Sequence, residues 1–79
     1  MNDRIMPHNT DAEQAVLGSV FLSKYALQQV LEEINSEEFY LDSHAKIFDA
    51  IKYLAEKGAP IDVTTVTAEL DKRKVLSTV

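Results

Sequence analysis

His44 is the residue of this sequence best suited to acid–base chemistry, because two carboxylates, Asp42 and Asp49, lie a few positions away. A histidine–carboxylate pair can act as a general base, but a hydrolytic site also needs a nucleophile held against that base. No serine or threonine is marked by its neighbours as such a nucleophile. We therefore predict no catalytic residue in this segment. His44 is expected to pack in the first turn of a helix, near Phe39 and Tyr40.

Metal and nucleotide sites are both disfavoured by the residues that the chain contains. It has two histidines and no cysteine, whereas a zinc site needs three or four ligands. Its two glycines, Gly18 and Gly58, are too far apart to form the glycine-rich loop that cradles a phosphate. We therefore predict no metal and no cofactor within this segment.

Charged residues gather in three short clusters: two acidic pairs at 32–33 and 37–38, and the basic triplet at 72–74. Adjacent residues on a helix point apart, so neither acidic pair forms an acid–base dyad. We expect a solvated face there, with an acidic docking patch for a partner as the alternative. The basic triplet lies at the C-terminal end of a predicted helix, where the helix dipole favours cations. Charge pairing or solvation is expected, with phosphate contact as the alternative.

The charge balance argues against nonspecific binding to nucleic acid. The 79 residues include 13 acidic and 8 basic side chains, for a net charge of −5, and DNA-binding proteins gain affinity by neutralising phosphates. No window is long and apolar enough to span a membrane, and residues 1–10 lack the apolar core of a signal peptide. We expect a cytoplasmic protein with no membrane partner.

The apolar residues recur at spacings of three and four, which predicts an all-α fold. We expect a small orthogonal bundle of four main helices, at 11–22, 24–35, 43–57 and 62–74, with a short turn of helix at 36–39. Residues 1–9 are expected to be a flexible arm, and residues 10–79 a globular head. The tail at 75–79 has no cap or turn, so we expect the chain to be cut short there.

Cap residues predict where these helices begin. Asn9 or Thr10 is expected to cap the first helix, and with Thr10 as the cap, Glu13 would complete a capping box. Ser23 is expected to cap the second helix and Asp62 the fourth.

The glycines predict one helix end and one close contact. Gly58 is expected to stop the third helix in the left-handed conformation, with Pro60 shortly after. Gly18 costs about 1 kcal/mol relative to alanine inside a helix, so we expect a neighbouring helix to pack closely against it.

The expected core consists of the apolar stripes of the four helices together with the pair at 39–40, both turned inward. Its members are Ala12, Ala15, Val16, Leu17, Ser19, Val20, Phe21, Leu27, Val30, Leu31, Ile34, Phe39, Tyr40, Ile47, Phe48, Ile51, Leu54, Ala55, Val63, Val66 and Leu70.

The run at 7–19, PHNTDAEQAVLGS, resembles the opening of bacterial replicative DNA helicases of the DnaB type. The resemblance extends over residues 7–76 and rests on both halves of the chain together. Its motif residues here are Gly18, Phe39, Tyr40, His44, Phe48, Gly58, Pro60 and Asp62. It implies that residues 10–79 are the helical head of the helicase N-terminal domain, truncated before a helical hairpin, and that these motif residues maintain its fold.

The resemblance also implies a function. In that family the N-terminal domain is a protein-interaction and oligomerisation module of a homo-hexamer. The full-length enzyme unwinds duplex DNA in the 5′→3′ direction on single-stranded DNA during replication, with ATP and magnesium in a separate motor domain. The N-terminal domains form a collar that docks the C-terminal domain of primase in the primosome, and a helicase loader is a further candidate partner.

Two other hypotheses remain open at this point. A helix-turn-helix DNA-binding domain could use the helices at 43–57 and 62–74, although the second offers threonines and acidic residues before any cation. A small stand-alone enzyme would have to depend on His44.

Overall fold

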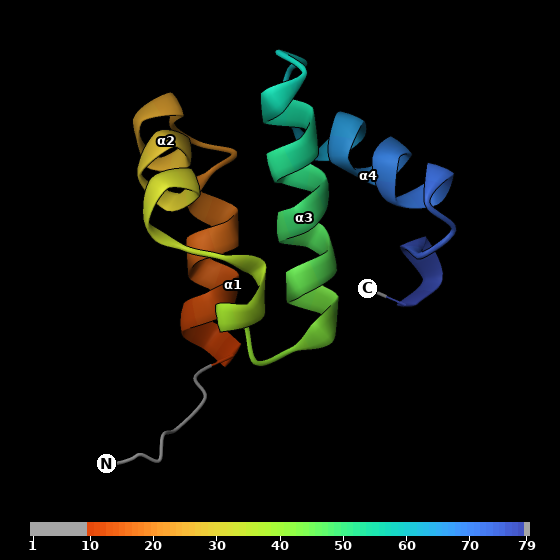
Figure 1. Cartoon of the computed structure of the whole chain (residues 1–79), viewed down its shortest axis with the longest axis horizontal. Helices are drawn as coiled ribbons and strands as arrows, with labels where there is room; N and C mark the ends of the chain where they lie inside the picture. Colours follow the sequence, from red (N-terminus) through yellow and green to blue (C-terminus); the bar gives the residue numbers. More distant parts are fainter. Residues whose placement is uncertain (1–9, 79) are drawn as a thin grey trace.

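The computed structural model describes residues 10–78, which fold into four α-helices and two short 3₁₀ turns (Figure 1). In chain order these are α1 (Thr10–Ser19), α2 (Lys24–Glu33), η1 (Ser36–Glu38), α3 (Asp42–Glu56), α4 (Val63–Lys72) and η2 (Leu76–Thr78). The described residues contain no strand, so the predicted all-α fold is confirmed. The arm predicted at 1–9 lies outside the described residues.

Helix α3 is the central element of the fold. It contacts α1, α4 and η1, while α2 packs against α1 (Figure 1). Phe48 and Ile51 on α3 have no exposed surface, and Leu54 one turn further is also buried. This spacing of three places their side chains on one face of the helix. The longest helix therefore supplies the middle of the core.

The core gathers one or more apolar side chains from each main helix and from the segment after η1. Its buried members are Leu17, Val20, Val30, Phe39, Phe48, Ala50, Ile51, Leu54, Val66 and Leu70. All but Ala50 belong to the expected core.

The predicted caps of α2 and α4 are confirmed. Ser23 Oγ accepts a hydrogen bond from the Ala26 amide at 3.2 Å. Asp62 Oδ1 accepts one from the Thr65 amide at 2.8 Å, and Thr65 Oγ1 accepts one from the Asp62 amide at 3.0 Å. Each satisfies amides that a helix N-terminus leaves without an intrahelical partner.

The predicted glycine stop of α3 is also confirmed. Gly58 has φ +75, in the left-handed region. Its amide donates to the Ala55 carbonyl, and the Ala59 amide donates to the Leu54 carbonyl, each at 3.0 Å. These two bonds form a Schellman motif, which satisfies carbonyls at the end of the helix.

The first helix ends earlier than predicted, and its glycine is not packed. After Ser19 the chain tightens into a turn, in which the Phe21 amide donates to the Gly18 carbonyl at 3.2 Å. Gly18 is exposed, and a Cβ placed on it would have no heavy atom of a neighbouring element within 4 Å. The prediction of a closely packed helix at Gly18 is therefore wrong.

The predicted inward faces of α1 and α4 are partly wrong. Ala12 and Ala15 are exposed, whereas Leu17 on α1 and Val20 in the turn after it are buried, and their larger side chains remove more apolar area from water. Val63 is 66% exposed. The buried residues of α4 are Val66, Glu69 and Leu70, which lie on one face of the helix.

Tyr40 was predicted to face the core, but it is 58% exposed. Phe39 before it is buried and has an extended backbone, with φ −82 and ψ 131. Successive side chains of an extended segment point to opposite sides. Once Phe39 turns inward, Tyr40 therefore turns outward.

Candidate functional site

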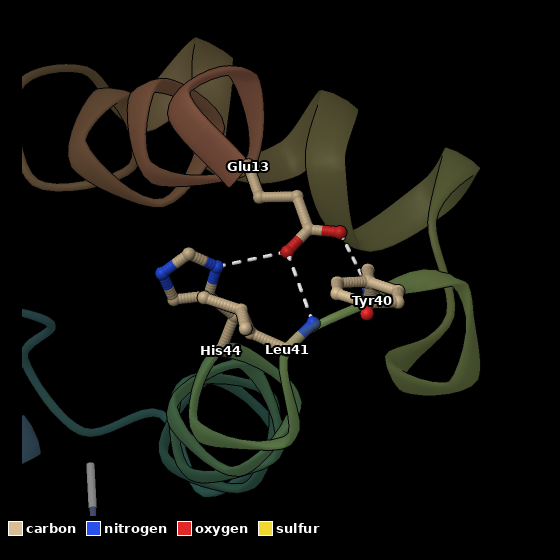
Figure 2. Close-up of polar contacts among 4 residues, drawn as sticks. All are labelled: Glu13, Tyr40, Leu41 and His44. Carbon is tan, nitrogen blue, oxygen red and sulfur yellow. Dashed lines mark hydrogen bonds and ion pairs between the residues drawn. The ribbon is translucent and has the colours of Figure 1, made fainter. Parts of the chain in front are cut away.

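The carboxylate of Glu13 joins α1 to the start of α3 (Figure 2). Its Oε2 accepts a hydrogen bond from the Tyr40 amide. Its Oε1 lies 2.9 Å from His44 Nδ1 and 3.4 Å from the Leu41 amide nitrogen. We call these four residues the Glu13 clamp. Since a carboxylate can only accept, Nδ1 of His44 donates.

The residues before α3 supply no side-chain cap, so the start of this helix depends on a carboxylate from another helix. The residue that precedes α3 is Leu41, which has no side-chain oxygen and caps nothing. The first amides of a helix lack intrahelical partners, and the helix dipole places partial positive charge there. Glu13 supplies the missing negative charge from α1 (Figure 2).

The pKa of Glu13 lies below its ordinary value of 4.5. Burial acts in the opposite direction and raises this pKa, because it disfavours the charged form. The bonds from the Tyr40 amide, the His44 ring and the Leu41 amide together outweigh burial, because each favours the ionised carboxylate. Glu13 is thus an anion engaged through both oxygens, an arrangement that suits structural attachment and leaves little capacity to accept a substrate proton.

His44 links the clamp to the core. Its ring contacts that of Phe39 edge-on, with centroids 6.4 Å apart and an interplanar angle of 79°. Phe39 in turn packs against Phe48 at 5.3 Å between centroids. The predicted place of His44 beside Phe39 is confirmed.

The carboxylate that contacts His44 is neither Asp42 nor Asp49, the two near it in the sequence. Asp42 instead forms an ion pair with Lys46, at 3.1 Å, and the true partner is Glu13. With Thr10 as the cap, Glu13 was expected to complete a capping box of its own helix, but its two oxygens bond to residues 40–44. No spacing in the sequence signals a pair of residues so far apart.

A second polar cluster joins the C-terminal ends of α3 and α4. Arg73 Nε donates to Glu69 Oε2 at 2.7 Å, which confirms charge pairing for this member of the basic triplet. This bond to Arg73, with the nearby charges of Arg73, Lys72 and Lys57, lowers the pKa of Glu69 in spite of its burial. The cations of Lys57 and Arg73 lie 5.0 and 5.2 Å from the ring centroid of Tyr53. These contacts are cation–π interactions.

Helix α4 presents a surface ill suited to a DNA recognition helix. Glu69 is buried, so its carboxylate faces the protein. The exposed residues of α4 are Val63, Thr64, Thr67, Ala68, Asp71 and Lys72. This face offers one cation beside one carboxylate, which provides little attraction for phosphates.

A family model described as the DnaB-like helicase N terminal domain matches residues 5–79. The chain belongs to this family. This DnaB-like domain is 44% identical over 79 residues to the replicative DNA helicase DnaC of Bacillus subtilis, a match that covers all of this chain and 17% of the relative. It is 47% identical over 70 residues to the replicative DNA helicase DnaB of Mycobacterium leprae, covering 89% of this chain and 12% of the relative.

The fold is likewise similar to that of a solved DnaB domain. The crystal structure of the N-terminal domain of DnaB helicase from Mycobacterium tuberculosis matches with a TM-score of 0.87 at 44% identity. The match covers 91% of this chain and 50% of that chain. The DnaB-like domain described here thus spans less than a fifth of the length of the curated relatives.

The motif residues of this DnaB-like domain fall into two spatial groups. Phe39, His44 and Phe48 form the connected ring contacts between the clamp and the core. Gly58, Pro60 and Asp62 lie along the turn from α3 to α4, which Thr65 Oγ1 ties together by donating to the Pro60 carbonyl at 2.8 Å. Gly18 and Tyr40 belong to neither group and are exposed.

Within residues 10–78, no group of three or more histidine, cysteine or acidic side chains is arranged to hold a metal ion. Over the same residues, no helix is long and apolar enough to cross a membrane.

Proposed function

We propose that this domain is the N-terminal head of a hexameric replicative DNA helicase and acts as a protein-interaction module. In this role it helps to assemble the N-terminal collar and to recruit primase through primase's C-terminal domain. The observation that carries the proposal is the match to the DnaB-like N-terminal domain family over residues 5–79, together with a matching fold.

The packing of the head suits such a role. The Glu13 clamp fixes α1 against the start of α3, and the rings of His44, Phe39 and Phe48 continue that attachment into the core. A domain held in this way presents its outer surface in a fixed orientation. Repeated copies around a ring then combine weak contacts through a high effective concentration.

The acidic pairs offer one part of that surface. Glu32, Glu33, Glu37 and Glu38 are all exposed, at the end of α2 and in η1. Glu38 also accepts a hydrogen bond from the Asn35 amide at 2.7 Å, which supports its own short turn. Docking of a basic partner surface on these pairs, by primase or a helicase loader, remains a prediction.

The proposal extends to the parent protein. We propose that the parent protein is an ATP-dependent enzyme that unwinds DNA. ATP and magnesium would bind in a separate motor domain, and the ring of six subunits would hold single-stranded DNA. The supporting observation is that both curated relatives carry the name replicative DNA helicase.

The test joins residues 1–79 to their natural continuation and measures self-association by light scattering and primase binding by calorimetry. We expect both to be detectable in the longer protein. The control is the parent from which residues 1–79 are deleted, which should retain ATP hydrolysis and lose the response to primase. Absence of both self-association and primase binding in the longer protein would contradict the proposal.

A further inference from the structure

A small apolar hollow lies beside the first two turns of α1, close to where the chain enters this helix. Its apolar walls come from Ala12 and Val16 on α1, from Ile34 at the end of α2 and from Phe39 after η1. Its volume is about 230 Å³, whereas a protein cavity of about 150 Å³ already holds benzene. Val16 and Ile34 are partly exposed, so an apolar side chain placed here would remove their remaining surface from water.

The charges at this hollow are negative. Glu13 and Glu38 line it, and no cation is found among the described residues of its lining. Glu37, next to Glu38, is exposed as well. Glu38 accepts a hydrogen bond from the Asn35 amide, but a carboxylate has about four acceptor positions. The hollow is therefore complementary to an apolar side chain that has a cation close to it.

The segment that leads into α1 contains this combination of residues. Arg4, Ile5 and Met6 follow one another within residues 1–9. An extended chain can span about 13 Å between Met6 and Thr10. Along the helix, Val16 is only about 9 Å beyond Thr10. If the segment turns back along α1, Met6 therefore reaches the hollow.

This tether favours the chain's own segment over other occupants of the hollow. A side chain attached so close to its site has an effective concentration on the order of millimolar, which a second copy or a partner protein would have to exceed. The other end of the described chain is remote, because η2 packs against α4 on the right of Figure 1, whereas α1 lies on the left. Of the two ends, the N-terminal one is thus the end that starts beside the hollow.

We propose that residues 4–9 fold back as a strap, with Met6 in the hollow and Arg4 beside the carboxylates of Glu37 and Glu38. Methionine suits this place because its flexible side chain fills irregular apolar gaps. The strap ties α1 to η1 next to Glu13, whose carboxylate joins α1 to residues 40–44. The proposal concerns the packing of the head and does not depend on the collar and primase role.

Backbone preference and charge together select Met6 rather than Ile5. Met6 precedes a proline, and a residue in that position favours an extended backbone. In an extended segment, residues 4 and 6 point to one side and residues 3 and 5 to the other. With Ile5 in the hollow, Asp3 would therefore lie beside the carboxylates, where like charges repel. With Met6 in the hollow, the cation of Arg4 takes that place.

Methyl NMR of the 79-residue chain tests the placement of Met6 directly. The chain has two methionines, Met1 and Met6, so labelling of methionine methyl groups gives two signals. We expect nuclear Overhauser effects from Met6 to the methyl groups of Val16 and Ile34, and none from Met1. A sample that mixes labelled and unlabelled molecules separates contacts within one chain from contacts between two copies.

Substitutions test which residue of the strap is buried. Met6→Ser should lower the melting temperature by about 4 °C or more. Ile5→Ser is the matched control and should change it by less than about 2 °C. Arg4→Glu should also lower the melting temperature, and this effect should shrink as the salt concentration rises from about 50 to about 500 mM, because salt screens the charge pairing.

Three results would overturn the proposal. The first is contact of Ile5 rather than Met6 with the hollow, or equal melting temperatures of Met6→Ser and Ile5→Ser. The second is absence of any contact from Met6 to Val16 or Ile34 within one chain. The third is contact seen only between labelled and unlabelled molecules, which would assign the hollow to a second copy.

Discussion

Glu13 and His44 are 31 positions apart in the sequence, yet Oε1 of the first lies 2.9 Å from Nδ1 of the second. The same carboxylate accepts the amides of Tyr40 and Leu41, directly before α3. These amides belong to the segment that leads into α3, whose own preceding residue, Leu41, makes no side-chain cap. One side chain thus holds the backbone at the entry to α3 and fixes the relative position of two helices.

Replacement of Glu13 by alanine should lower the free energy of unfolding by about 1–3 kcal/mol, because it leaves backbone amides without an acceptor. Glu13→Gln should cost less, since its carbonyl oxygen can still accept one of these bonds. Urea unfolding followed by circular dichroism measures both. Glu33→Ala, on an exposed position of α2, is the control and should change stability by less than about 0.5 kcal/mol. Equal effects of Glu13→Ala and Glu33→Ala would contradict the role of the clamp.

The clamp should also make stability depend on pH. The pKa of Glu13 in the folded chain lies below the ordinary value of 4.5 that applies to the unfolded chain. Its ionised form therefore stabilises the fold fully above pH 4.5, and this contribution is lost as the pH falls from 4.5 through the folded-state pKa. The difference in unfolding free energy between the parent chain and Glu13→Gln should be constant near neutral pH and change below 4.5. Urea unfolding over a pH series measures it, and a difference that stays constant through acid pH would contradict this assignment.

The features that sequence analysis predicted correctly depend on residues close together in the chain. Ser23 and Asp62 cap helices by bonds to amides three residues ahead. Gly58 stops α3 by bonds within its own turn. The local sequence contains both partners of each interaction, so its pattern is sufficient to predict them.

The features that could not be predicted from the sequence depend on tertiary packing. A local capping box was expected for Glu13, but contacts with residues 40–44 hold its carboxylate instead. Gly18 was expected against a neighbouring helix, although only the assembled fold decides which face of α1 is covered. Tyr40 was expected to turn inward together with Phe39, but the extended backbone at Phe39 turns it outward. Residue type and spacing hold no information on these arrangements.

Gly18→Ala should stabilise the domain by about 0.5–1 kcal/mol, because alanine reduces the freedom of the unfolded chain and fits the helix. The added methyl group meets no neighbouring heavy atom within 4 Å. Thermal unfolding measures the effect as a raised melting temperature. Gly58→Ala, at φ +75, is the opposite case and should lower it. A loss of stability in Gly18→Ala would show that α1 packs more closely here than the structure indicates.

Lys74 is the non-glycine residue with positive φ among the described residues, at φ 62. It occupies the position after α4 that Gly58 occupies after α3, with its amide bonded to the Asp71 carbonyl at 2.9 Å. A side chain in this conformation is strained, so Lys74→Gly should stabilise the domain by about 0.5–1 kcal/mol. Urea unfolding measures the change, with Ala68→Gly at an exposed position in the middle of α4 as the control, which should destabilise by about 1 kcal/mol. Destabilisation by Lys74→Gly would contradict the left-handed conformation.

Phe48 lies at the centre of the core, with no exposed surface and with the ring of Phe39 at 5.3 Å. Phe48→Ala should cost about 3–5 kcal/mol, because it removes buried contacts and leaves a cavity. A domain of this size has little stability to lose, so this variant is expected to unfold. Phe48→Leu keeps most of the volume and should cost less than about 1.5 kcal/mol, so its stability remains measurable by urea unfolding. Tyr25→Ala, at an exposed aromatic residue, should leave the midpoint nearly unchanged. If Phe48→Leu and Tyr25→Ala shifted the midpoint equally, Phe48 would not be the residue around which the helices pack.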